Sequence, residues 1–203
     1  MPKLLLALLL AAASCMAAPT NSDFGHTDPA AKKESKKVER LDGCSFLGGQ
    51  YFDGDSFSLL TPKGETRICR LYAVDTCETD NEFAERVTEQ ALYFGITSEQ
   101  AVELGNKAKT FTEELLKNKK LCFVTTWHKA PGRSKTDRFY GEIIVGGESL
   151  ACILVKNGLA RIHGIIPPND GAFVFTRAKL EQLEAEAKKA GAGGWARLEG
   201  AGK

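Results

Sequence analysis

The chain contains two neighbouring stretches, residues 51–60 and 66–74, in which β-branched and aromatic residues predominate. Between them stands a Thr-Pro-Lys-Gly run at 61–64, and proline and glycine favour tight turns over extended backbone. The pattern therefore predicts two strands joined as a β-hairpin.

Helical periodicity appears after residue 96. Thr97 and Gln100 have the spacing of a capping box, in which each side chain accepts a hydrogen bond from the other residue's backbone N–H. Apolar residues then recur every three or four positions, at Leu104, Ala108, Phe111 and Leu115. We expect a helix that turns this stripe towards the core.

Two further strands are predicted at 121–127 and 139–145, joined by a polar loop over 128–137 that contains proline and glycine. A short helix over 149–157 and a final helix over about 176–190 follow, and each precedes a glycine placed to end it. Four to five strands in a meander with interposed helices predict a small α+β barrel.

The start of the chain lies apart from this pattern. Residues 4–13 have no polar side chain; they follow Lys3 and precede a run of small residues. This order is typical of a secretory signal, and the run is shorter than the about 20 apolar residues of a membrane span. We therefore expect a signal peptide over 1–17 and export of the chain, as a secreted or periplasmic protein.

A lipid anchor is the alternative to a freely exported chain. Residues 12–15 resemble a lipoprotein cleavage box without its usual leucine, so the chain would contact a membrane only if Cys15 carried a lipid. The Lys- and Ser-bearing segment that follows predicts a flexible tether over 18–40. The folded domain is then expected over 41–197, with a disordered tail over 198–203.

Composition and charge narrow the class of protein. The 203 residues, 43% of them hydrophobic, exclude collagen-like, wholly disordered and polytopic membrane proteins. The net charge is +1, yet residues 75–104 hold eight acids and one base, whereas residues 105–138 hold nine bases and three acids. Such segregation is typical either of two solvated faces or of a site that holds a polyanion against a cation.

Five cysteines follow Cys15, at positions 44, 69, 77, 122 and 152. Export permits disulfides, but an odd number leaves at least one thiol free or paired outside the chain. The sequence has no C-x-x-C motif and only three histidines, which argues against a structural zinc site. We expect His128 and His163 to be loop or core residues rather than ligands.

Chemically active side chains gather in two segments. Residues 53–56 read Asp-Gly-Asp-Ser, which alone is typical of a turn. Residues 70–79 read Arg-Leu-Tyr-Ala-Val-Asp-Thr-Cys-Glu-Thr, so that a strand end delivers a guanidinium, two carboxylates and a hydroxyl. An arginine beside such acids either makes a structural ion pair or binds phosphate.

Together these segments resemble the D-G-D-T and R-L-x-x-V-D-T-P-E-T motifs of the staphylococcal nuclease family. Residues 154–160 resemble its L-V-x-x-G-L-A motif, and 168–170, 182–189 and Trp195 resemble its C-terminal stretch. The resemblance covers about residues 45–197. It implies a five-stranded OB-fold barrel with about three helices, and Ca²⁺-dependent cleavage of DNA and RNA, single strands favoured, to 3′-phosphate products.

The resemblance also implies roles for individual residues. Asp55 and Asp75 are expected to bind Ca²⁺ through their carboxylates, and Thr76 through its backbone carbonyl. Arg70 is expected to bind the scissile phosphate, and Glu78 to position or deprotonate the attacking water.

A second phosphate-binding arginine is matched by Arg138 when residues are counted back without gaps from the glycine at 158, and Arg133 is the alternative. The D-x-Y-G-R pattern of the family is not kept here, because residues 137–142 read Asp-Arg-Phe-Tyr-Gly-Glu.

Three other departures from the family pattern bear on function. Cys77 replaces a proline, extra residues stand near 80–95, and Gly164 and Ile166 occupy the places of two tyrosines that flank the nucleotide. Because base stacking is worth about 1–3 kcal/mol per base, we expect weaker substrate binding or an altered base preference.

Two other functions use fewer of these residues. A non-catalytic OB-fold protein would bind nucleic acid on the same barrel, and an exported structural protein would form intermolecular disulfides. Neither needs the set Asp55, Arg70, Asp75 and Glu78, so the sequence favours the nuclease.

Overall fold

The computed structural model describes residues 37–131, 136–169 and 171–196. The predicted signal peptide, Cys15, nearly all of the predicted tether, Arg133 and the predicted tail lie outside these residues. Within the described ranges, no helix has both the length and the apolar character that crossing a membrane requires.

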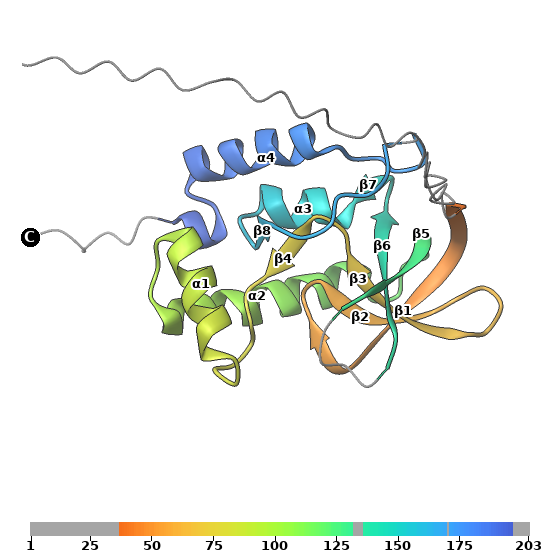
Figure 1. Cartoon of the computed structure of the whole chain (residues 1–203), viewed down its shortest axis with the longest axis horizontal. Helices are drawn as coiled ribbons and strands as arrows, with labels where there is room; N and C mark the ends of the chain where they lie inside the picture. Colours follow the sequence, from red (N-terminus) through yellow and green to blue (C-terminus); the bar gives the residue numbers. More distant parts are fainter. Residues whose placement is uncertain (1–36, 132–135, 170, 197–203) are drawn as a thin grey trace, which may run out of the picture. The chain divides into compact units, whose positions relative to one another are not determined.

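The described residues form eight strands, four α-helices and one 3₁₀ turn (Figure 1). The strands are β1 (Glu39–Asp53), β2 (Ser56–Leu60), β3 (Thr66–Leu71), β4 (Val74–Thr76), β5 (Leu121–Ala130), β6 (Arg138–Val145), β7 (Glu148–Ser149) and β8 (Ala160–Ile162). The helices are α1 (Ala84–Phe94), α2 (Ser98–Leu116), α3 (Leu150–Lys156), α4 (Arg177–Ala190) and the turn η1 (Gly193–Trp195).

Five of the strands close into a barrel. They pair antiparallel in the order β3-β2-β1-β5-β6, and a parallel pairing of β6 with β3 completes the ring. At this seam Ile68 pairs with Arg138 and Leu71 with Gly141. β7 pairs antiparallel with β6, while β4 and β8 form a separate two-stranded sheet. The fold is therefore α+β and compatible with the predicted five-stranded OB-fold barrel.

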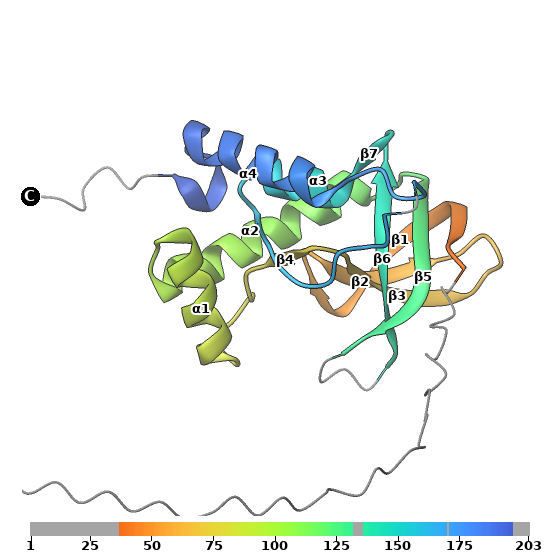
Figure 2. The same cartoon turned by 45° about the horizontal axis from the view of Figure 1, so that its top comes forward.

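The helices gather to one side of the barrel, with α1 packed against α2 and α4 packed against α3 (Figures 1 and 2). α2 also contacts β1 and β4. The barrel interior is apolar, and its largest fully buried side chains include Phe57, Leu59, Leu71, Phe123 and Ile143.

The capping box predicted at Thr97 is confirmed. Its hydroxyl accepts a hydrogen bond from the Gln100 N–H at 3.3 Å, and Gln100 Oε1 accepts one from the Thr97 N–H at 2.9 Å, so that α2 begins at Ser98. The predicted strands at 121–127 and 139–145 correspond to β5 and β6.

The predicted strand over 51–60 is wrong in one respect, because a turn divides it. Asp53 Oδ1 accepts hydrogen bonds from the N–H groups of Ser56 at 2.6 Å and Asp55 at 3.2 Å, and this turn separates β1 from β2. Side chains that bond nearby backbone in this way compete with a strand ladder.

Three other stretches also differ from the prediction. The stretch over 66–74 breaks after Leu71, because Ala73 has a left-handed φ of 63°. The residues near 80–95 form the helix α1, and β1 begins at Glu39, inside the predicted tether.

Candidate functional site

Both chemically active segments meet at one end of the barrel, where β1 turns into β2 and β3 leads to β4. Asp55 lies in the turn before β2, and its carbonyl accepts a hydrogen bond from the Leu71 N–H at 2.8 Å. The left-handed Ala73 is fixed by backbone hydrogen bonds to Ile165 and His163, both at 2.9 Å. After this bend, Asp75 in β4 lies close enough to Asp55 for one guanidinium, that of Arg70, to pair with both carboxylates.

Arg70 bridges the two aspartates. Its Nη1 pairs with Asp55 Oδ1, and its Nη2 donates to Asp75 Oδ1 at 2.8 Å. Both carboxylates are buried, with 2% and 1% of their side-chain surface exposed, whereas Arg70 is 14% exposed. The Thr76 N–H donates to Asp55 Oδ2 at 2.8 Å, so the three predicted metal-binding residues lie together.

Two further arginines, which the sequence analysis did not single out, also contact Asp75. From α1, Arg86 donates to Asp75 Oδ1 at 2.8 Å and to Glu78 Oε1 at 2.5 Å. From β8, Arg161 donates to Asp75 Oδ2 at 2.9 Å and to Glu89 Oε1 at 2.9 Å. We call this set the arginine–carboxylate cluster; its members are Asp55, Arg70, Asp75, Glu78, Arg86, Glu89 and Arg161.

The charge of Asp75 is stabilised inside the protein. Burial alone would raise the pKa of its carboxyl, but Arg70, Arg86 and Arg161 lower that pKa well below the ordinary value of 3.8. Asp75 is therefore ionised at neutral pH despite its burial.

The buried amide of Gln90, on α1, fixes the backbone around the cluster. Its Nε2 donates to Asp75 Oδ2 at 3.1 Å and to the Thr76 carbonyl at 3.0 Å, and its Oε1 accepts from the Glu78 N–H at 2.9 Å. Both polar atoms of this amide thus bond to β4 or to the residues just after it. These bonds hold the backbone of Glu78 in place.

The donor set fits a hard divalent cation. Ca²⁺ prefers oxygen ligands, and Asp55, Asp75 and the Thr76 carbonyl supply only oxygens. The guanidinium of Arg70 occupies one oxygen of each carboxylate, so a cation bound between them would take its place. No group of three or more His, Cys, Asp or Glu side chains among the described residues could hold a metal, so a cation here would need main-chain and water oxygens as well.

Arg138, the predicted second arginine, lies near the cluster but forms no ion pair with it among the described residues. Its Nη2 donates to the Pro131 carbonyl at 2.7 Å. Burial lowers the pKa of Arg138, and so does the positive charge of Arg70, whereas Asp53 raises it. The alternative, Arg133, lies outside the described residues.

Glu142, the last residue of the stretch that departs from the family's D-x-Y-G-R pattern, makes its hydrogen bond outside the cluster. Its side chain is buried and accepts a hydrogen bond from the Val174 N–H at 3.0 Å. Burial raises the pKa of this carboxyl. This position therefore supplies no positive charge to the site.

The thiols lie in the core. All five described cysteines are buried and free, so Cys77 packs beside the site without a covalent partner among them. Burial raises the pKa of the Cys77 thiol to about 12. Of the histidines, His128 packs edge-on against Tyr140 with ring centroids 5.8 Å apart, and His163 bonds Ala73 through its backbone.

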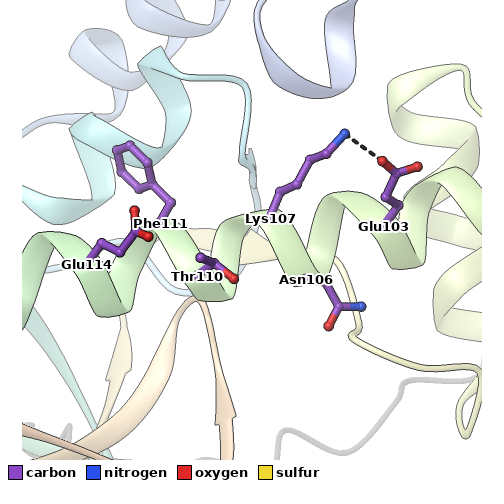
Figure 3. Close-up of a pocket in the computed structure, with 6 residues that line it drawn as sticks. All are labelled: Glu103, Asn106, Lys107, Thr110, Phe111 and Glu114. Carbon is purple, nitrogen blue, oxygen red and sulfur yellow. Dashed lines mark ion pairs between the residues drawn. The ribbon is translucent and has the colours of Figure 1, made fainter.

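A shallow hollow of about 380 Å³ lies on the outer face of α2 (Figure 3). Side chains of this one helix line it, and Lys107 and Glu103 within it form an exposed ion pair at 2.8 Å. No member of the arginine–carboxylate cluster reaches it, so the cluster remains the candidate site.

Comparison with known proteins adds two findings. The model of a family described as staphylococcal nuclease homologue matches residues 68–197. A segment of 64 residues is 36% identical to Ribonuclease TUDOR 2 of Arabidopsis thaliana. That segment is 32% of this chain and spans only 6% of the length of that relative.

Proposed function

The chain belongs to the staphylococcal nuclease homologue family, and from this premise we propose that it is a Ca²⁺-dependent nuclease. Membership indicates a nuclease or nucleic-acid-binding function, and the similarity to a protein named as a ribonuclease supports the former. The observation that carries the proposal is the bridge by Arg70 between two buried carboxylates, with Glu78 beside them. The proposed substrates are DNA and RNA, single strands favoured, and the proposed products end in a 3′-phosphate.

The chemistry follows from charge. A phosphodiester is anionic and gains negative charge on its non-bridging oxygens as water attacks, so a positive group that binds these oxygens stabilises the transition state. The two nitrogens with which Arg70 bonds Asp55 and Asp75 lie on one edge of its guanidinium, and such an edge matches two phosphate oxygens once it leaves the carboxylates. Ca²⁺ held by Asp55, Asp75 and the Thr76 carbonyl would neutralise phosphate charge and orient water.

Glu78 supplies the carboxylate that would position or deprotonate the attacking water. Its carboxylate is partly exposed, and its backbone is held by Gln90. Arg86 pairs with Glu78 Oε1 and so orients this carboxylate. A carboxylate at this place is suited to accept a hydrogen bond from water and then its proton.

We also propose export, which rests on the N-terminal apolar run alone. A secreted or periplasmic chain without residues 1–17 is expected, and a lipid on Cys15 is the alternative. The mass of the processed N-terminus distinguishes the two.

The proposed nuclease is tested by incubating the purified chain with single-stranded DNA and RNA in excess Ca²⁺ or in excess chelator. We expect acid-soluble product with 3′-phosphate ends only when Ca²⁺ is present. Product at equal rates in chelator would contradict the role of Ca²⁺ while leaving the nuclease intact.

The second candidate is a non-catalytic OB-fold protein that binds nucleic acid. One observation favours it, namely that residues 137–142 depart from the family's D-x-Y-G-R pattern and that Arg138 forms no ion pair with the cluster among the described residues. Binding of the same strands without cleavage, by folded protein under reducing and oxidising conditions alike, would support this candidate and contradict the nuclease.

A further inference from the structure

Among the described residues, neither Arg138 nor Glu142 pairs with the arginine–carboxylate cluster, and Arg133 lies outside them. Glu142 is buried against the backbone of Val174, and Arg138 is hydrogen-bonded to the Pro131 carbonyl. A phosphodiester held by Arg70 alone would have donors on one side only. Donors from another element would therefore complete the contacts of a phosphate held by Arg70.

The three arginines on Asp75 differ in how far they reach solvent. Arg161 is 3% exposed and Arg70 14%, whereas Arg86 is 43% exposed. Arg161 is enclosed by its bonds to Asp75 and Glu89, so it orients Asp75 and does not face a substrate. Arg86 is the most solvent-accessible guanidinium of the cluster.

Arg86 and Arg70 converge on a single atom. Arg86 Nη2 and Arg70 Nη2 both donate to Asp75 Oδ1, each at 2.8 Å. Two guanidiniums that share one carboxylate oxygen lie side by side, and they are spaced to share the oxygens of one phosphate as well. Nη1 of Arg86 makes no hydrogen bond with any described residue, so it has donors available.

The other partner of Arg86 is the carboxylate that is proposed to activate water. Arg86 Nε donates to Glu78 Oε1 at 2.5 Å. While this bond holds, that oxygen is occupied by the guanidinium. A phosphate, being anionic and accessible, competes with Glu78 for the same donors.

We propose that Arg86 is a catalytic residue that binds the scissile phosphate beside Arg70 and, in moving to it, releases Glu78. The helix α1, which has no counterpart in the family's motifs, thus supplies a further arginine to the site. Glu78 is then free to accept a hydrogen bond from water next to the bound phosphate. This inference rests on the proposed function, because it assigns a residue of the same site.

The test uses the full chain with Arg86→Gln, Arg86→Lys, Glu78→Gln and, as a matched control, Arg177→Gln. Arg177 also forms an ion pair, with Glu181 at 2.8 Å, but lies exposed on α4. Binding of a single-stranded oligonucleotide is measured in chelator, and kcat and KM are measured in Ca²⁺. Circular dichroism verifies that each variant is folded.

We expect Arg86→Gln to weaken oligonucleotide binding about tenfold or more, because a charge-assisted phosphate contact is lost. Its kcat should fall by on the order of 100-fold. Arg86→Lys should recover little of either, since an ammonium lacks the planar fork. Glu78→Gln should bind the oligonucleotide as tightly as wild type or more tightly, because the Glu78 carboxylate no longer competes with phosphate for Arg86. If Arg86 had only a structural role, Arg86→Gln and Glu78→Gln would not differ in affinity in this way.

Each outcome decides the inference. Wild-type affinity and a kcat within threefold of wild type in Arg86→Gln would overturn it while leaving the proposed nuclease in place. If wild type does not cleave at all, the nuclease fails, yet the binding comparison still tests whether Arg86 contacts phosphate. If Arg86→Gln does not fold, Arg86→Lys, which keeps the positive charge beside Glu78, carries the same comparison.

Discussion

At the scale of the residue, one buried carboxylate connects most of the charged groups of the site. Asp75 bonds three guanidiniums and the amide of Gln90, which come from β3, α1 and β8. A buried ion pair is costly to break from one side, because the remaining charges lose their partner without regaining water. Asp75 therefore has a structural role in addition to its proposed role in metal binding.

Replacement of Asp75 by asparagine is expected to lower the free energy of unfolding at pH 7 by about 3–5 kcal/mol, as measured by urea denaturation. The folded-state pKa of Asp75 lies below its ordinary value of 3.8, so the carboxylate stabilises the fold above that pH and loses this effect as the pH falls further. The stability difference between wild type and variant should therefore begin to shrink below about pH 4 and shrink further as the pH approaches the folded-state pKa.

The control for this comparison is Asp137→Asn. Asp137 is 58% exposed and pairs with Lys129 at 2.6 Å on the surface, where such pairs are worth about 1 kcal/mol or less. If Asp75→Asn lowers the free energy of unfolding at pH 7 no more than this control does, Asp75 does not bind the arginines as described.

The sequence alone predicted part of this cluster. Arg70, Asp75, Thr76 and Glu78 are near one another in the chain, so a strand end was enough to group them. Arg161 lies 86 residues from Asp75, and no local pattern connects the two. Arg86 left a signal that was not used, because it is the one base in the acidic stretch 75–104.

At the scale of the element, α2 is pressed against the backbone that presents Glu78. Gly105 lies at the contact, and a Cβ atom there would come 2.5 Å from the Cys77 carbonyl oxygen and closer still to that of Glu78. The helix can approach the loop only because this residue has no side chain.

Gly105→Ala is expected to destabilise the protein by about 1–3 kcal/mol although alanine is the better helix former, because the overlap involves backbone that cannot rotate away. The same shift should displace Glu78 and lower kcat on single-stranded DNA by roughly 100-fold. Lys107→Ala, two residues further along α2, removes only an exposed ion pair and should change neither quantity measurably. Stability and kcat equal to wild type in Gly105→Ala would contradict the close approach.

Elements with strong local signals were predicted, and those without them were not. α2 carries a capping box, whereas the residue before α1, Phe83, makes no side-chain capping bond with it. The part of β1 between residues 39 and 50 was not predicted, because glycines with positive φ at 43, 48 and 49 interrupt the alternation of apolar and polar residues. Ala73 separates β3 from β4 because its φ is positive. Glycine is the residue that usually adopts this conformation, so an alanine gives no sign of it in the sequence.

At the scale of the whole molecule, the segregated charges of the sequence are partly cancelled within the fold. Asp75, Glu78 and Glu89 from the acidic stretch bond arginines from β3, α1 and β8. The acidic stretch is therefore not simply a solvated face, and its net charge overstates the field at the site.

The buried thiols give a prediction for the whole fold. A thiol-reactive dye should label the five cysteines slowly in the native protein and fully in urea, because burial shields them and raises the pKa of Cys122 to about 12 and of Cys152 to about 11. The unfolding midpoint should be the same with and without reductant. Fewer than five reactive thiols in urea without reductant would reveal a disulfide. An intermolecular disulfide would favour the alternative of an exported structural protein.

The measurement that most directly tests the central claim compares the hydrolysis of single-stranded DNA by wild type and by Arg70→Lys, at saturating substrate and in excess Ca²⁺. Because one ammonium cannot replace a guanidinium that binds two phosphate oxygens, kcat should fall by on the order of 10²–10³-fold while circular dichroism shows an intact fold. A kcat of Arg70→Lys within a few-fold of wild type would contradict the assignment of this cluster as the phosphodiester-cleaving site.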